Sequence, residues 1–206
     1  MATCATSPRS TPWPRTRRRL LAALAAAALA LAGTPAAART VAGVEVPEEV
    51  TLADGTMLRL NGAGVRRKLF VKVYVGALYL PRPRSAPAAI LAADEPQRVE
   101  MRILYRHIGV RRMRRTWEEG LRRNHPPERL ERLRPHIERF YAAIRPVRRG
   151  DVVTFTYRPG EGMAIAHNGR LQDVIPGRGL FAALLGVWLG PRPPDEGLKR
   201  AMLGRQ

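Results

Sequence analysis

The stretch LNGAGVRRKLFVKVYVGALYLP, residues 60–81, contains the pattern that decides the fold. Asn61 to Gly64 are residues that favour turns, and we expect them to close a short strand just before Arg66. Leu69 to Leu80 is apolar and aromatic with β-branched residues interleaved, which predicts a central strand that ends at the Pro81-Arg82-Pro83 break. Arg66 therefore lies between a predicted turn and a predicted buried strand. These neighbours would fix the direction in which its guanidinium points.

Further strand patterns flank this stretch on both sides. Upstream they cover Thr40 to Val46 and Met57 to Leu60, and downstream Arg98 to Tyr105 alternates in polarity as a half-buried strand does. Toward the C-terminus we predict three more strands, at Asp151 to Tyr157, Met163 to His167 and Arg170 to Val174. The last two flank Asn168-Gly169, a residue pair that strongly favours a tight hairpin turn.

Helical patterns lie between and after these strands. Apolar residues recur at steps of three and four and predict two amphipathic helices, one with Val110, Met113, Trp117 and Leu121, ending near Asn124, and one with Leu130, Leu133, Ile137, Tyr141 and Ile144. GLFAALLGVWLG, residues 179–190, is apolar on all sides and favours a buried helix. This order predicts an α+β domain, an antiparallel β-sheet with helices packed mainly on one face and an apolar cleft between the two layers.

The N-terminus has the basic, apolar and small-residue order of a secretory signal peptide. A cluster of arginines precedes the apolar run Leu20 to Ala32, and the triplet Ala36-Ala37-Ala38 follows it. The run has 13 residues, fewer than the roughly 20 that span a bilayer, although a retained anchor is the alternative. We therefore expect a signal peptide over 1–38, one domain over 39–206 and a periplasmic location, by either the general or the twin-arginine route.

The net charge of the chain is +19, and removal of the five arginines before residue 39 leaves +14. Such a charge attracts nucleic acid or anionic membranes. Many of the arginines, however, alternate with apolar positions in the two predicted amphipathic helices, a pattern typical of a solvated helix face. Together with export, this argues against a nucleic-acid partner. A peripheral contact with an anionic membrane is an alternative that rests on charge alone.

Cysteine and histidine usage argues against a metal or cofactor. The single cysteine, Cys4, lies in the predicted signal peptide, so the mature chain would have no disulfide and no thiol nucleophile. His107, His125, His136 and His167 do not share with a carboxylate the helical spacing that zinc enzymes use. We therefore expect neither a metal site nor a cofactor.

The stretch at 60–81 resembles the signature of the chalcone-isomerase-like family, in which a Gly-x-Gly-x-Arg turn runs into a strand with a Phe-x-Lys-x pattern and a Gly/Ala-x-Tyr-Leu close. The segments WEEGLRRN, GDVVTFTYRPGEGMAIAHNG, GLFAALLGVWLG and LKRAMLG follow in an order and spacing similar to those of its exported bacterial branch. The resemblance implies the family's open-faced β-sandwich over nearly all of the mature chain.

The resemblance also implies a ligand site at Arg66. In family members the turn arginine points into the ligand cleft, where it holds the anionic end of a flavonoid in the plant enzymes and a carboxylate in the plastid fatty-acid-binding relatives. A guanidinium offers a bidentate fork to such a planar anion. Tyr74 stands where the plant enzymes have a threonine that helps activate a catalytic water, and Tyr105 and Asn124 are candidates for their later polar contacts.

These assignments have plain structural alternatives. Arg66 would then be a surface residue beside Arg67 and Lys68. The aromatic residues Tyr79, Tyr105 and Trp117 would then belong to the core.

Two function classes follow from the resemblance and its departures. The first is a non-catalytic periplasmic protein that binds a small amphipathic carboxylate, such as a fatty acid, between sheet and helices with Arg66 as its anchor. The replaced threonine and the lack of a convincing hydroxyl in NGRLQDVIPG favour it. The second is an intramolecular lyase or isomerase of the chalcone isomerase type, in which Arg66 stabilises a phenolate or enolate. We expect a monomer, although no residue pattern fixes the oligomeric state.

Overall fold

The computed structural model describes Met1 and residues 37–205. The predicted signal peptide, 1–38, therefore lies almost wholly outside the described residues. From Ala36 onward the chain forms one compact unit, which holds every strand and helix of the described residues. No helix among the described residues has the length and apolar character needed to cross a membrane.

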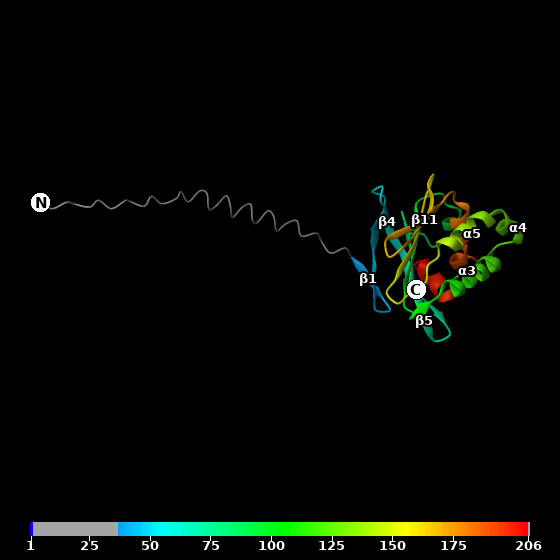
Figure 1. Cartoon of the computed structure of the whole chain (residues 1–206), viewed down its shortest axis with the longest axis horizontal. Helices are drawn as coiled ribbons and strands as arrows, with labels where there is room; N and C mark the ends of the chain where they lie inside the picture. The colour runs from blue at the N-terminus through cyan, green and yellow to red at the C-terminus, as the bar shows by residue number, and fades with distance from the viewer. Residues whose placement is uncertain (2–36, 206) are drawn as a thin grey trace. The chain divides into compact units, whose positions relative to one another are not determined.

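A seven-stranded antiparallel sheet forms the centre of this unit (Figure 1). Its strands lie in the order β11-β10-β9-β6-β5-β4-β3. Their bounds are β3 Glu49–Thr51, β4 Met57–Lys68, β5 Val71–Leu80, β6 Gln97–Ile103, β9 Val152–Arg158, β10 Gly162–His167 and β11 Arg170–Ile175. Two short hairpins complete the strands, β1 Ala38–Val41 with β2 Val44–Pro47, and β7 His107–Ile108 with β8 Val147–Arg148.

The helices cover one face of the sheet and the β1–β2 hairpin lies against the other (Figure 1). The helices are α2 Pro87–Ala92, α3 Val110–Asn124, α4 Pro127–Arg132, α5 Arg134–Ala143, α6 Gly179–Leu189 and α7 Glu196–Met202. This arrangement confirms the predicted α+β fold class. All residues of α6 from Leu180 to Leu189 are buried, which confirms the buried helix expected from its sequence.

The sheet carries an apolar cluster on each face. Tyr74 and Leu78 of β5 contribute to the cluster under the helices, whereas Val75, Ala77 and Tyr79 contribute to the cluster under the β1–β2 hairpin. Because side chains alternate along a strand, a strand that is buried on both faces must be apolar throughout. This explains the continuous apolar run of β5. Tyr79 is fully buried and donates its hydroxyl to a backbone carbonyl, so it is a core residue.

The predicted turn at Asn61 to Gly64 is wrong. β4 continues from Met57 to Lys68 with local shifts of register, and the chain reverses at Leu69-Phe70 instead. The glycines allow α7 to lie directly on the strand. A Cβ at Gly62 would lie 2.0 Å from the carbonyl oxygen of Ala201, and one at Gly64 would lie 2.5 Å from the Cβ of Ala201.

The second predicted amphipathic helix, Leu130 to Ile144, is two shorter helices, α4 and α5. The break lies at Leu133, which ends α4 and begins α5. Pro135 occupies the first turn of α5. Proline is accepted there because it has no N–H to donate to the preceding turn, and for the same reason it interrupts a continuous helix.

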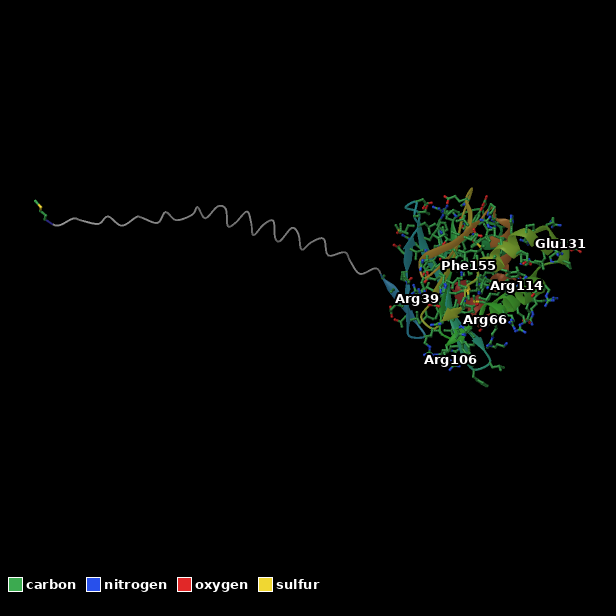
Figure 2. All side chains as sticks on the ribbon, in the orientation of Figure 1. Arg39, Arg66, Arg106, Arg114, Glu131 and Phe155 are labelled. Carbon is green, nitrogen blue, oxygen red and sulfur yellow. The ribbon has the colours of Figure 1, made fainter. Side chains whose placement is uncertain are left out.

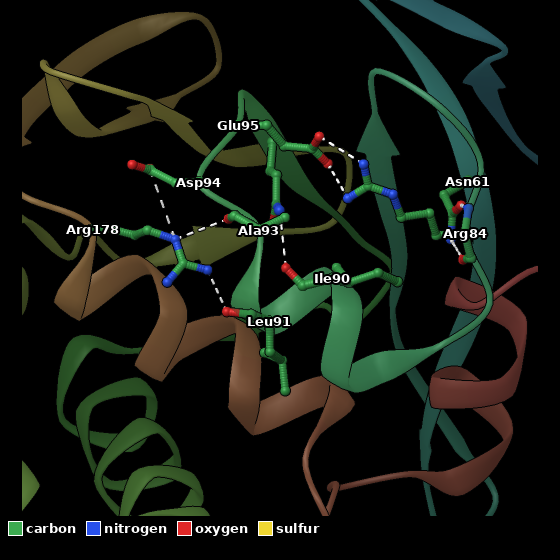
Figure 3. Close-up of polar contacts among 9 residues, drawn as sticks. Asn61, Arg84, Ile90, Leu91, Ala93, Asp94, Glu95 and Arg178 are labelled. Atoms are coloured by element: carbon green, nitrogen blue, oxygen red, sulfur yellow. Dashed lines mark hydrogen bonds and ion pairs between the residues drawn. The ribbon is translucent and has the colours of Figure 1, made fainter.

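Polar contacts hold α2 between the sheet and the beginning of α6 (Figure 3). Arg84 forms a two-pronged ion pair with Glu95, with distances of 2.6 and 2.9 Å. Arg178 donates to the backbone carbonyls of Leu91 and Ala93 at the C-terminal end of α2. These bonds satisfy carbonyls that the end of a helix leaves without partners, so we assign the network a structural role.

Candidate functional site

Arg66 and Tyr74 lie side by side on the helix-facing side of the sheet. They are direct partners in the register of β4 and β5, and residues so paired present their side chains on the same face. The Cζ of Arg66 lies 5.9 Å from the centre of the Tyr74 ring. Arg66 is half-buried, whereas Arg67 and Lys68 are exposed. The environment of Arg66 therefore differs from that of the basic residues that follow it.

The hydroxyl of Tyr74 accepts a hydrogen bond from Nε1 of Trp188 on α6, at a distance of 2.8 Å. An indole nitrogen can only donate, so the oxygen of Tyr74 must be the acceptor in this bond. The proton of Tyr74 makes no hydrogen bond to any residue that the structure describes. Tyr74 is buried, and its hydroxyl is a donor without an acceptor among the described residues.

Burial raises the pKa of Tyr74, and the positive charge of Arg66 acts against that rise. The phenol therefore keeps its proton at physiological pH. Within this site Tyr74 is a hydrogen-bond donor and not a general base.

The guanidinium of Arg66 is the second donor of the site. Within residues 37–205 it forms neither an ion pair nor a side-chain hydrogen bond, and its Cζ lies near the ring of Tyr74. The nearby carboxylate of Asp195 is already engaged, because its two oxygens accept the backbone N–H groups of Arg67 and Leu198 at 2.8 and 2.9 Å. The guanidinium of Arg66 thus lies near the ring of Tyr74, and neither the guanidinium nor the Tyr74 proton has an acceptor among the described residues.

The predicted apolar cleft between sheet and helices is closed in this structure. The layers leave a cavity of about 30 Å³, whose lining includes Met101, Trp117, Phe140 and Phe155. That volume corresponds to about one water molecule. Trp117 of α3 stacks edge-on against Trp188, with ring centres 5.1 Å apart. A chain of aromatic contacts therefore leads from the cavity through Trp188 to Tyr74.

Tyr105 and Asn124, the other predicted site residues, have different surroundings. The ring of Tyr105 lies 5.7 Å from the guanidinium of Arg112 and lines an open hollow beside the sheet. The amide of Asn124 makes three hydrogen bonds to the backbone, one to Gly120 and two to Arg192, and so ties the end of α3 to the segment after α6. A ligand role for these two residues stays a prediction.

Sequence reasoning did not identify Trp188 as part of the site. Its segment reads as a uniformly buried helix, and its hydrogen bond joins residues 114 positions apart. A tryptophan in such a helix carries the one signal that was available, because a buried indole N–H usually requires an acceptor. The sequence does not indicate which residue supplies that acceptor. Trp117, considered in the sequence as a core aromatic, is buried and lines the cavity.

Comparisons with known proteins concern the chain as a whole. Residues 38–204 match the family described as chalcone isomerase-like. No curated protein matches the sequence. Among solved structures, the crystal structure of a fatty-acid binding protein from Arabidopsis thaliana is similar, with a TM-score of 0.58 and 17% sequence identity over 76% of this chain and 96% of that chain. At this identity the likeness shows the fold alone. The family match over residues 38–204, together with an antiparallel sheet that carries its helices on one face, shows that the chain belongs to the chalcone isomerase-like family.

Proposed function

We propose that this protein is an exported bacterial member of its family that binds a small amphipathic carboxylate, such as a fatty acid, without catalysing a reaction. The observation that carries the proposal is the pair of adjacent donors, the guanidinium of Arg66 and the hydroxyl of Tyr74, at the edge of an apolar core. A carboxylate accepts hydrogen bonds at both oxygens, so in this proposal one planar anion takes a hydrogen bond from each donor. The Arabidopsis protein of similar fold is described as a fatty-acid binding protein, which supports the same class of ligand.

The acyl chain would extend from this donor pair into the apolar layer between sheet and helices. The present cavity of about 30 Å³ is too small for it, because ligand pockets have volumes of about 300 Å³ or more. Binding therefore requires the layers to separate. α3 is the element suited to move, because it buries two residues, Trp117 and Leu121, and its other residues are exposed or half-buried.

The site is less suited to the isomerase alternative. Tyr74 is a neutral donor, and the carboxylate oxygens of Asp195 are both occupied by backbone N–H groups. Tyr74 therefore does not act as a general base near neutral pH. The donor pair can polarise a phenolate, but neither Arg66 nor Tyr74 is a base that takes up a proton from a substrate.

The test is calorimetric titration of dodecanoate into wild type, Arg66→Leu and Arg66→Lys. Arg66→Leu should weaken binding by about 2 kcal/mol, roughly thirtyfold, because it removes a charged donor from a partly desolvated carboxylate. Arg66→Lys should recover little, since an ammonium lacks the planar two-donor geometry. Arg67→Leu is the matched control, because Arg67 is exposed and should leave the affinity unchanged.

Circular dichroism and thermal melts should show that all variants keep the fold. Equal affinity in wild type and Arg66→Leu would remove Arg66 from the site. Wild type should also show no cyclisation of a chalcone above the buffer rate. Clear turnover in that assay would favour the isomerase over the binding protein.

A further inference from the structure

The tip of the β4–β5 hairpin exposes three consecutive apolar side chains. Leu69, Phe70 and Val71 are 86%, 98% and 46% exposed. The hairpin projects from the lower edge of the domain in Figure 1, and none of the three residues belongs to either apolar cluster of the sheet. Single exposed apolar residues are common on protein surfaces, whereas adjacent ones at the end of a projecting hairpin indicate an interaction site.

The turn chemistry of this tip differs from that of the other tight hairpins. The two-residue turns at Ala42-Gly43 and Asn168-Gly169 have glycine in the second position. Here the corresponding residues are Leu69 and Phe70, and Leu69 adopts a φ of 54°. That left-handed conformation is unfavourable for leucine and easy for asparagine or glycine. The apolar pair is therefore not explained by the needs of the turn.

Positive charge surrounds the apolar tip. Arg67, Lys68 and Lys72 flank it and are exposed. The hairpin from 57 to 80 contains no acidic residue. Exposed aromatic and aliphatic side chains bordered by lysine and arginine are the composition that binds the interface of an anionic bilayer.

A basic hollow adjoins the tip. Val71 and Lys72 line it together with Arg106, Arg149 and Arg102, whose charge is paired with Glu100, and its volume is about 590 Å³. None of the described residues that line it is acidic. Arg106 lies at the lower edge of the domain in Figure 2, the edge from which the hairpin projects in the same orientation. Tip and hollow thus form one apolar and cationic surface.

We propose that this surface docks the protein on an anionic phospholipid bilayer. Leu69 and Phe70 enter the interfacial layer, while Lys68, Lys72 and Arg106 lie at the level of the phosphate groups. The charge complementarity favours a lipid surface, since lipid phosphates match a ring of cations around an apolar tip. This inference does not depend on the ligand proposed for Arg66.

The test compares the full chain with its Leu69→Asn/Phe70→Gly variant in vesicle sedimentation. Asn-Gly suits a two-residue turn, so the variant should fold at least as stably as wild type. With vesicles of phosphatidylcholine and phosphatidylglycerol, the variant should partition about tenfold less than wild type, because it lacks the inserting side chains. Leu171→Asn is the matched control, because Leu171 is 62% exposed on β11 and lies outside the tip. All chains share the same N-terminus, so its apolar run contributes equally to each.

A Phe70→Trp variant reports on the tip directly. Its added fluorescence should shift to the blue with anionic vesicles and stay unshifted with phosphatidylcholine alone, and the shift should disappear at high salt. Equal sedimentation of wild type and Leu69→Asn/Phe70→Gly, or an unshifted Phe70→Trp, would overturn the proposal. Self-association in sedimentation velocity that the double substitution abolishes, without vesicle binding, would assign the tip to a second copy of the chain instead.

The carboxylate site and the membrane-docking surface can be tested independently of each other. The Leu69→Asn/Phe70→Gly variant should bind dodecanoate in solution as wild type does, because the substituted residues do not contact Tyr74 or Trp188 in the described core. Vesicle binding without any dodecanoate binding would reject the carboxylate site and keep the docking surface.

Discussion

Among the described residues, the hydroxyl of Tyr74 accepts one hydrogen bond, from Trp188, and its proton has no acceptor. Removal of the hydroxyl oxygen tests both features. Tyr74→Phe leaves Nε1 of Trp188 buried without an acceptor, so we expect a loss of about 1 to 3 kcal/mol in the free energy of unfolding. Urea denaturation measures this loss. Dodecanoate binding should weaken as well, by about 1 kcal/mol, because the second donor of the site is gone.

Tyr141→Phe is the matched control for Tyr74→Phe. Tyr141 is also buried, and its hydroxyl makes no hydrogen bond with the described residues. Removal of that hydroxyl should therefore have little effect on either measurement. Similar stability losses in the two variants would show that the bond to Trp188 contributes nothing specific, and an unchanged affinity in Tyr74→Phe would exclude its hydroxyl from the ligand site.

At the scale of elements, His125 attaches α3 to α6 through one hydrogen bond. His125 follows the last residue of α3, and its Nε2 donates to the carbonyl oxygen of Ala183 on α6 at 2.8 Å. A Cβ at Gly186 would lie 2.8 Å from its Cε1, so the ring is closely fitted against α6. Burial lowers the pKa of His125 below its usual value. The hydrogen bond to Ala183 acts against this shift, and the charge of Arg129 adds to it.

This pKa shift predicts a pH dependence of stability. The unfolded chain binds a proton at His125 near pH 6.5, while the folded chain resists protonation, so the free energy of unfolding should fall as the pH drops from about 6.5 toward the lower folded pKa. His125→Gln keeps a donor but cannot titrate, so its stability should vary less between pH 7 and about 5. Urea denaturation across this range measures the difference. Parallel pH profiles for the two proteins would contradict the assignment.

A carboxylate with a lowered pKa affects the free energy of unfolding at a more acidic pH than His125 does. The hydrogen bond from Arg139 lowers the pKa of Asp173, so the stability from that pair is present above its usual titration range and is lost at more acidic pH. His125 can therefore be observed separately from the acid transition.

At the scale of the whole molecule, the N-terminal sequence predicts export. Fractionated cells should contain a soluble form in the periplasm that begins at or near Arg39. N-terminal sequencing of the purified protein is the measurement. Replacement of Leu24 and Leu29 by arginine should block processing, because it interrupts the apolar run. A membrane-bound species that retains Met1 would contradict the proposal and would identify the run as an anchor.

The periodicity of the sequence was enough to predict most elements of the fold. Steps of three and four residues located α3, the alternation at Arg98 to Tyr105 located β6, and Asn168-Gly169 located a hairpin, because each pattern reflects a local geometry. The glycines before Arg66 were misread, since a glycine permits either a turn or a close approach. Which of these it serves depends on α7, which follows β4 by more than a hundred residues.

The sequence by itself determined the family signature around Arg66, the polarity of each face and the basic charge of the chain. The tertiary structure alone decided that Arg66 lies beside Tyr74, that Trp188 engages the oxygen of Tyr74, and that the layer beneath them is closed. The physical reason is the separation of the interacting residues along the sequence. Patterns of polarity and turn residues act over a few positions, whereas hydrogen bonds and packing between β5 and α6 join residues that only the folded chain brings into contact.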